Sequence, residues 1–338
     1  MELIDSDNIF IIAEAGVNHN GSIALAKQLI DVAAKAHADA VKFQTFISEE
    51  VVSTDAPKAE YQKQTTDASE SQFEMIKKLE LSKEDHQELM NYANHKNIMF
   101  LSTPFDKKSV DILVELGVPL IKISSGEITN HPFLKYIAKK GLPIILSTGM
   151  STLKEVAEAV SVIKTAGCEY LTLLHCTSNY PARVEDCNLL AMKTMADAFD
   201  VPVGYSDHTL GIYVSLAAAA MGACVIEKHF TLDKNLPGPD HRASLEPAEL
   251  EEMVRGIRLV EKVRGSSVKA PVESELEVRD VARKSIVAKV DIPACTVITE
   301  DMLSFKRPGT GVAPKDVSKL IGRKTKYNIK KDKLIKQI

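Results

Sequence analysis

The stretch IFIIAEAGVNHNGS at residues 9–22 decides between two folds. It begins with a near-continuous apolar run, which is typical of a strand that is covered on both faces of a parallel sheet. An open doubly wound sheet usually places a GxGxxG turn directly after its first strand, and AEAGVNHNGS does not have that spacing. This stretch therefore favours a closed barrel.

The rest of the chain repeats the same unit. Short apolar runs alternate with amphipathic helical patterns, and eight such units over roughly 265 residues match a (β/α)8 TIM barrel in number and length. The expected strands are 9–15, 40–45, 98–103, 120–125, 143–148, 171–176, 201–206 and 223–229. The clearest expected helices are 23–36, 83–96, 108–117, 153–167, 211–223 and 247–265.

Near SSVKAPVESELEVRD (266–280) the composition becomes polar and the alternation stops. The final segment has short strand patterns and frequent Pro and Gly, which indicates a small β-rich module. We predict a barrel domain over 1–268, a linker over 269–282 and a β-rich domain over 283–338.

The connection after residue 45 is unusually long for this fold. It extends to about residue 81, and Tyr61 and Gln62 within it are candidate lid residues. The alternative is a solvated loop with a short helix at 71–80.

Composition excludes some classes of partner. Apolar residues make up 45% of the chain and the formal net charge is −4, so a large core is expected without the basic face that nucleic acids or anionic membranes require. Five cysteines form no CxxC pair, which is typical of reduced, mostly buried thiols in a cytoplasmic protein. The N-terminal apolar run is too short for a signal peptide or a membrane span.

In a (β/α)8 barrel the catalytic groups come from the carboxyl ends of the strands. We therefore expect the polar residues that close the eight runs to converge on one mouth. They are Glu14, Lys42, Gln44, Ser102, Thr103, Lys122, Ser124, Ser125, Glu127, Ser147, Thr148, His175, Thr177, Ser206, Asp207, His208, Glu227, Lys228 and His229.

Two lysines stand out because they lie inside apolar strands. Lys42 and Lys122 would each be costly to bury unless an anion met them. A single such lysine is readily explained by a side chain that reaches the barrel rim. Two lysines together with the SSGE (124–127) and STGM (147–150) hydroxyls and glycines are better explained by a phosphate or carboxylate ligand.

Two histidines close neighbouring strands, in GYSDHT (204–209) and EKHF (227–230). His208 and His229 could hold a divalent metal, with Asp207 or Glu227 orienting the rings or balancing charge. The alternative is a pair of satisfied core histidines. Two imidazoles without a thiolate suit an open octahedral site, which favours Mn²⁺ or Mg²⁺ over structural zinc. Such an ion would act as a Lewis acid on a carbonyl oxygen.

Motifs along the whole chain resemble the sialic acid synthase family, whose members condense phosphoenolpyruvate with an N-acylated hexosamine to give nine-carbon acidic sugars. KRPGTG (306–311) also resembles the signature of the antifreeze-like (SAF) domain that ends those enzymes. The other motifs are EAGVNHNG (14–21), VKFQT (41–45), KAEYQ (58–62), STPFD (102–106), KISSGE (122–127), LSTGM (146–150), HCTSNYP (175–181), GYSDHT (204–209), EKHFTLDK (227–234) and GPDHRASLEP (238–247).

This resemblance implies a (β/α)8 barrel, a divalent metal, most often Mn²⁺ with Mg²⁺ or Co²⁺ as alternatives, and a domain-swapped homodimer. It assigns His208 and His229 to the metal, and Glu14 and Glu127 to the reacting carbons. The positions that match phosphoenolpyruvate-binding residues are Lys42, Thr103, Lys122, Ser125, Ser147 and Ser206. The positions that match sugar-binding residues are Gln44, Tyr180, Asp240 and Arg307, the last reaching the N-acyl group from the other subunit.

The sugar itself stays open at this point. EAGVNHNG differs from the ELSANHNG of the pseudaminic acid branch, and together with IEKHFTLDK it favours a legionaminate-type over a neuraminate-type product. Two other classes of function are alternatives. One is a metal-dependent aldolase or lyase on the same barrel, which would not need two buried lysines. The other is a carbohydrate-binding protein, which the basic run RKTKYNIKKDK (323–333) argues against.

Overall fold

The computed structural model describes residues 8–53, 56–58, 66 and 70–336. The chain divides into two compact units, Met1–Gly265 and Ser266–Ile338. Tyr61 and Gln62, the candidate lid residues, lie outside the described residues. Among those that are described, no helix is long and apolar enough to cross a membrane.

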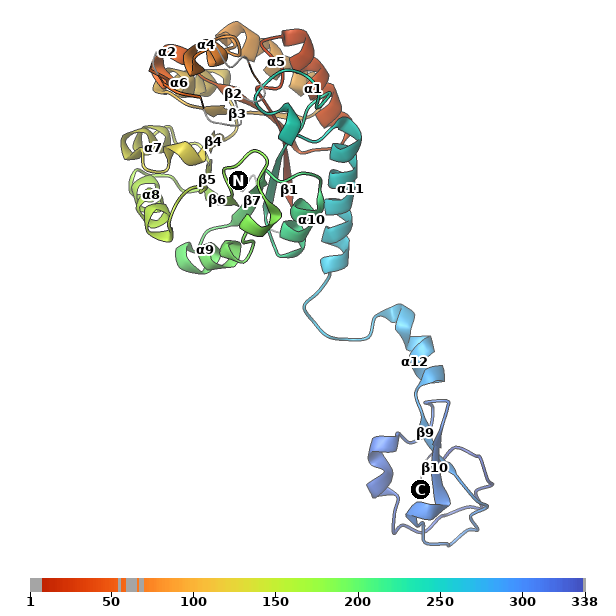
Figure 1. Ribbon diagram of the computed structural model, residues 1–338. Coiled ribbons are helices and arrows are strands. Elements are labelled where there is room, and N and C mark those ends of the chain that lie inside the picture. The colour runs from red at the N-terminus through yellow and green to blue at the C-terminus, as the bar shows by residue number, and fades with distance from the viewer. Residues whose placement is uncertain (1–7, 54–55, 59–65, 67–69, 337–338) are drawn as a thin grey trace. The chain divides into compact units, whose positions relative to one another are not determined.

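The first unit is a parallel eight-stranded barrel surrounded by helices (Figure 1). The strands follow the order β3-β2-β1-β8-β7-β6-β5-β4, and β3 contacts β4 to complete the ring. The strands are β1 (Phe10–Gly16), β2 (Ala40–Thr45), β3 (Met99–Pro104), β4 (Ile121–Ile123), β5 (Ile144–Ser147), β6 (Leu171–Cys176), β7 (Val203–Asp207) and β8 (Val225–His229). The TIM-barrel prediction is confirmed.

The helices of this unit pack their apolar faces on the strands and form the larger hydrophobic core. Many begin at side-chain caps that the sequence supplies, such as Ser22, Ser82 and Thr152. The helices are α1 (Ile23–Lys35), α2 (Ser48–Val51), α4 (Gln72–Lys77), α5 (Lys83–His95), α6 (Lys107–Leu116), α7 (His131–Ala138), α8 (Leu153–Thr165), α9 (Ala191–Phe199), α10 (Tyr213–Ala220) and α11 (Pro247–Arg264).

The second unit begins with the segment predicted as a linker, which contains helix α12 (Leu276–Ala282). A small antiparallel sheet follows, formed by β9 (Ser285–Ala288) and β10 (Leu303–Lys306). Ile286, Ile298, Leu303, Leu320 and Ile335 form its own buried core. All five cysteines are free thiols, of which Cys295 is exposed and Cys168, Cys176 and Cys187 are buried.

Candidate active site

A polar cavity of about 270 Å³ opens at the carboxyl ends of the barrel strands. Residues from all eight strands or from the loops directly after them reach it, as expected for a barrel whose strands run in parallel. Its lining consists of Glu14, Lys42, Gln44, Thr103, Phe105, Lys122, Ser124, Ser125, Gly126, Ser147, Met150, Ser178, Tyr180, Ser206, His208, Glu227 and His229.

The floor of this cavity is an apolar layer inside the barrel. It consists of Ile12, Ala40, Leu101, Leu120, Ile145, Leu174 and Val225. Successive strand residues face opposite sides, so the residue two positions further on each strand points the same way. For this reason Ile12 is followed on the inner face by Glu14, Ala40 by Lys42, and Leu120 by Lys122.

We expected all polar residues at the strand ends to face the same cavity, and this expectation is wrong. Because side chains alternate along a strand, some of these residues face the cavity and others do not. Several of them point outward to the helices. Ser102 bonds Thr45, which in turn bonds His86 of α5, and the His175 ring bonds the Cys187 carbonyl. Asp207 also faces outward, where its carboxylate accepts from Ser215 of α10 and contacts neither histidine ring directly.

Four charged side chains meet in the cavity wall, and each is almost fully buried. Lys42 Nζ lies 2.7 Å from Glu14 Oε2 and 3.7 Å from Glu227 Oε2. Lys122 Nζ lies 3.7 Å from Glu227 Oε1, so Glu227 stands between the two lysines. The pairing makes burial of these charges tolerable, because each cation has a carboxylate partner.

Hydroxyl groups complete the surroundings of the lysines. Lys42 Nζ donates to Thr103 Oγ1 at 2.8 Å. Lys122 Nζ donates to Ser147 Oγ at 2.6 Å and to the Ile123 carbonyl at 3.0 Å. Ammonium and hydroxyl groups are therefore concentrated on the β2–β5 side of the cavity, where they can bind an oxyanion.

Burial and the neighbouring charges set the protonation of this cluster. Burial raises the pKa of Glu14 to about 7, which is well above its usual value even though Lys42 opposes the rise. Burial also acts to raise the pKa of Glu227, but Lys122 and Lys42 outweigh it and hold that pKa below its usual value. Burial lowers the pKa of Lys122. The two carboxyls of the cluster thus differ in acidity because only Glu227 is close to both lysines.

His208 and His229 lie side by side on the other side of the cavity. Their ring centroids are 5.6 Å apart, and the Tyr180 ring lies 4.2 Å from that of His208. Burial lowers the pKa of both histidines, so both are neutral near pH 7. The His208 Nδ1 donates to the Thr177 carbonyl at 2.7 Å, which leaves its Nε2 with a lone pair.

This pair fits a divalent cation. Two neutral imidazoles share one cavity, and His229 Nδ1 is buried without a hydrogen-bond partner in the described part of the chain. Among the described residues, no group of three or more His, Cys, Asp or Glu side chains has metal-binding geometry, so the protein would supply two ligands and leave other positions open. That donor set matches an open octahedral site better than a structural zinc site.

Eleven of the fourteen predicted site residues line the cavity, and three do not. Asp240 is buried beside it, with Oδ2 4.0 Å from His229 Nδ1, and burial raises its pKa to about 6. Glu127 instead accepts a hydrogen bond from Asn130 at 2.7 Å. Arg307 belongs to the second unit, where its exposed side chain donates to the Ala282 carbonyl.

Glu227 lines the cavity, although the resemblance assigned it no role in binding or catalysis. The signal was present, because Glu227 lies two residues before His229 and must share the inner face of β8 with it. Its Oε1 accepts a hydrogen bond from Ser206 at 3.0 Å, which ties β8 to β7 on the inner face.

Gly149 shapes the loop after β5. A Cβ atom there would lie 2.2 Å from Ser178 Oγ and 2.9 Å from Ser125 Oγ, and the Gly149 amide donates to Ser125 Oγ. We expect Gly149→Ala to displace both serines and to weaken binding of an anion in the cavity about tenfold, corresponding to ~1.4 kcal/mol. Isothermal titration with inorganic phosphate measures this loss.

Gly126→Ala is the matched control, because a Cβ at Gly126 meets nothing closer than Ser124 Oγ at 3.8 Å. Both glycines line or adjoin the same cavity, so only the lack of space at Gly149 distinguishes them. Equal phosphate affinities for the two variants would contradict the predicted role of Gly149.

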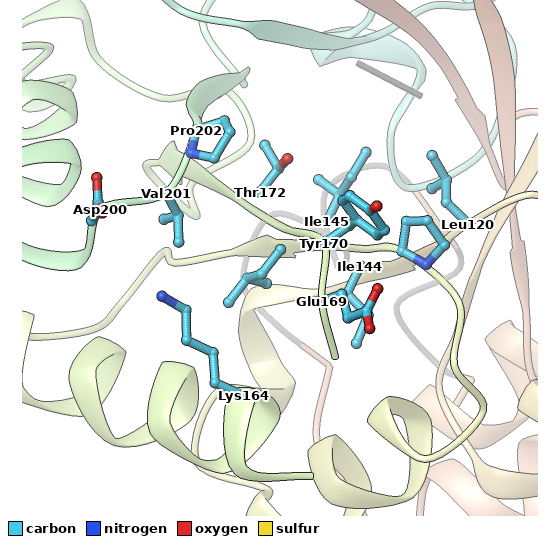
Figure 2. A pocket seen from close by; sticks show the side chains of 12 residues that line it. Leu120, Ile144, Ile145, Lys164, Glu169, Tyr170, Thr172, Asp200, Val201 and Pro202 are labelled. Atoms are coloured by element: carbon cyan, nitrogen blue, oxygen red, sulfur yellow. The ribbon is translucent and has the colours of Figure 1, made fainter. Parts of the chain in front are cut away.

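A second cavity, of about 180 Å³, lies at the amino ends of β5 and β6 (Figure 2). Its walls are mainly apolar side chains such as Ile144, Ile145 and Leu171. Lys164 and Glu169 stand at its edge, and Lys164 Nζ bonds the Phe199 carbonyl. The residues that line this cavity include neither paired lysines nor paired histidines.

The fold and the polar cavity together define an enzyme built on a (β/α)8 barrel. The model of the NeuB family matches residues 29–269, and that of the SAF domain matches residues 283–337. The chain therefore belongs to the NeuB family and carries a SAF domain.

Relatives agree over nearly the full length. The N,N'-diacetyllegionaminic acid synthase of Legionella pneumophila is 52% identical over 95% of this chain and 91% of its own. The enzyme of the same name from Campylobacter jejuni is also 52% identical, over 97% and 98%. The crystal structure of the N-acetylneuraminic acid synthetase from Leptospira borgpetersenii, in complex with citrate, is 37% identical with a TM-score of 0.71 and covers 81% of this chain and 90% of that one.

Proposed function

We propose that this protein condenses phosphoenolpyruvate with an N-acylated hexosamine to give a nonulosonic acid and phosphate. The observation that carries the proposal is the composition of the 270 Å³ cavity, in which two buried lysines with hydroxyl partners face two neutral histidines. The lysine side suits a phosphorylated carboxylic acid, and the histidine side suits a cation that activates a carbonyl group.

Phosphoenolpyruvate would bind on the β2–β5 side. Lys122 and Ser147 form one donor pair and Lys42 and Thr103 another, so phosphate and carboxylate oxygens can each find a charged donor. Ser125 and Ser206 extend this donor set within the same lining. In the free protein the lysines are attracted by Glu14 and Glu227. On binding, the anion would take over part of this interaction with the lysines.

His208 and His229 would hold the divalent cation, for which we propose Mn²⁺, with Mg²⁺ or Co²⁺ as alternatives. When bound, such an ion polarises the aldehyde oxygen of the open-chain sugar. Asp240 lies beside His229, with its Oδ2 4.0 Å from His229 Nδ1, and its carboxylate would help to balance the charge of the ion.

In the reaction, C3 of phosphoenolpyruvate forms a bond to the aldehyde carbon, and the aldehyde oxygen takes up a proton to become a hydroxyl. Water adds to C2 and gives up a proton. The C2–O bond to phosphate then breaks, which leaves a carbonyl group at C2 and releases phosphate with the proton of the C2 hydroxyl. We assign the proton of the attacking water to Glu14 rather than Glu127. Glu14 lines the cavity beside Lys42, whereas Glu127 is bound to Asn130 outside the lining. This geometry supports Glu14 over Glu127, the other acidic residue that the resemblance assigns to the reacting carbons.

The sugar would occupy the mouth near Gln44, Tyr180 and Asp240. The names of the two relatives at 52% identity support 2,4-diacetamido-2,4,6-trideoxymannose, which gives N,N'-diacetyllegionaminate, over N-acetylmannosamine. The free thiols of the described cysteines favour a reducing, cytoplasmic location for this synthesis.

We further propose a homodimer in which Arg307 of one subunit contacts the N-acyl group bound in the other. Exposed apolar residues support self-association, among them Tyr213 and Leu259 on the barrel and Val278 and Val281 on α12. Arg307 itself is exposed and engages only a backbone carbonyl in the contacts described within its unit.

Arg307→Ala is therefore expected to raise KM for the sugar about tenfold, because one charge-assisted hydrogen bond is lost. KM for phosphoenolpyruvate should stay nearly unchanged. Steady-state kinetics with each substrate varied in turn measures both, and Arg323→Ala, another exposed arginine of this unit, is the control. Unchanged sugar kinetics in Arg307→Ala would remove Arg307 from the site.

The function is tested by measuring phosphate release from phosphoenolpyruvate with Mn²⁺ and each candidate sugar in turn. The proposal predicts release that requires a sugar, with the diacetamido-trideoxy sugar giving the higher kcat/KM. Release that is equally fast without any sugar, or none with either sugar, would contradict it. A preference for N-acetylmannosamine would overturn the assigned sugar alone.

A further inference from the structure

A fully buried ion pair lies on the outer face of the barrel, directly behind the two histidines. Lys228 Nζ is 2.9 Å from Asp207 Oδ2, and both side chains have 0% exposure. Neither residue lines the cavity, so the proposed chemistry does not use them. A buried ion pair seldom adds much stability compared with apolar residues of the same size. Stability alone therefore does not explain why Asp207 and Lys228 are paired here.

The pair occupies the last register position that β7 and β8 share. In the parallel ladder Ser206 is opposite Glu227, and Asp207 is opposite Lys228. Ser206 and Glu227 bond across the inner face at 3.0 Å, while Asp207 and Lys228 bond across the outer face. The two strands are thus joined by side chains on both faces, immediately before the chain reaches His208 and His229.

His208 needs such support because it lies one residue beyond β7. The two residues that flank it are bound to each other, since Asp207 Oδ1 accepts from the Thr209 amide at 2.9 Å and from its hydroxyl at 2.8 Å. Lys228 Nζ also donates to the Thr209 carbonyl. His208 is therefore the middle residue of a turn, and Lys228 contacts the residue on each side of it, Asp207 and Thr209.

The same carboxylate connects this turn to the helix layer. Asp207 Oδ2 accepts from Ser215 Oγ of α10 at 2.6 Å. Lys228 precedes His229 directly, so one ion pair restrains the backbone next to both imidazoles. Restraint of this kind matters because a metal ion tolerates only small errors in ligand position.

We propose that Asp207 and Lys228 are positioning residues that set the separation of His208 and His229 for a divalent cation. This proposal rests on the metal site of the proposed function. It assigns no contact with substrate to either residue. Ser215 shares the role through its hydrogen bond to Asp207.

The test uses the double variant Asp207→Asn/Lys228→Met, which avoids leaving one charge unpaired in the core. Asn keeps an acceptor for the Thr209 amide, and Met keeps most of the length of the lysine side chain. Binding of MnCl₂ to the full-length protein, followed by the electron paramagnetic resonance signal of free Mn²⁺, should show a Kd about tenfold higher than that of the wild type. KM for phosphoenolpyruvate should change less than the Kd for Mn²⁺, because Lys42 and Lys122 lie on other strands.

The matched control is Asp39→Asn/Arg258→Met, which removes an ion pair of 2.6 Å from the amino ends of the strands of the same barrel. Both double variants are expected to melt at lower temperature, but only the first should bind Mn²⁺ more weakly. Ser215→Ala is a milder variant that serves if the first does not fold, and it should raise the Kd for Mn²⁺ by a smaller factor.

The outcomes separate this proposal from the proposed function. Wild-type affinity for Mn²⁺ in Asp207→Asn/Lys228→Met, or in Ser215→Ala if only that variant folds, would overturn the positioning role and leave the metal site in place. Equal weakening in the control would overturn it as well, since the effect would then be general destabilisation. A wild-type protein that does not bind Mn²⁺ would overturn both the positioning role and the metal site.

Discussion

Replacing His208 with alanine is expected to lower kcat by about a thousandfold or more, since polarisation of the carbonyl by a metal is worth several kcal/mol. His208 is one of two imidazoles that face the cavity among the residues that the structure describes, and its Nε2 is left with a lone pair by the bond from Nδ1 to Thr177. Phosphate release from phosphoenolpyruvate in the presence of Mn²⁺ and sugar measures the loss. The Kd for Mn²⁺ should rise in parallel.

His175→Gln is the control for this prediction. His175 also lies near the carboxyl end of a strand, but its ring points outward and bonds the Cys187 carbonyl at 2.8 Å. The variant should keep its Mn²⁺ affinity and most of its activity. Full activity of His208→Ala in chelator-treated buffer would contradict the metal site.

Replacing Lys122 with methionine is expected to reduce kcat/KM for phosphoenolpyruvate about a hundredfold. A hydrogen bond to a charged group contributes roughly 1.5–3 kcal/mol, and Lys122 would supply one to the donor anion. The change also removes one of the two lysines that lie 3.7 Å from Glu227, so the pKa of that carboxyl should rise. While the Glu227 carboxylate keeps its negative charge near pH 7, its repulsion of the bound anion adds to the loss of the lysine donor.

Isothermal titration with phosphoenolpyruvate, without sugar, measures the affinity directly. Lys164→Met is the matched control, because Lys164 stands at the other cavity, at the amino ends of the strands (Figure 2). It should bind phosphoenolpyruvate as the wild type does. A loss of affinity in Lys164→Met with none in Lys122→Met would move the donor site to the opposite end of the barrel.

The sequence predicted the barrel because its strands are buried on both faces and therefore appear as apolar runs. Their number and the missing GxGxxG turn were sufficient to choose the closed form. Helices α7 and α9 are not among the clearest expected helices, although the eightfold alternation of strands and helices leaves a place for each of them. The small helix predicted at 71–80 is present as α4.

The site was harder to predict because polarity alone does not tell which face of a strand a residue occupies. Asp207, Lys228 and His175 are as polar as their neighbours, yet each points toward the helices. Alternation from the apolar floor separates the inner residues, such as Glu227, from these outward-facing ones. Contacts of Glu127 depend on the local 3₁₀ turn at Ser125–Glu127, which no periodic pattern reveals.

Diffraction from crystals grown with Mn²⁺ and phosphoenolpyruvate tests the central claim most directly, through the anomalous signal of manganese. The account predicts one manganese peak bonded to His208 and His229, with the phosphate of phosphoenolpyruvate against Lys122 and Ser147. A peak bonded to neither imidazole, or phosphoenolpyruvate bound away from both lysines, would contradict it.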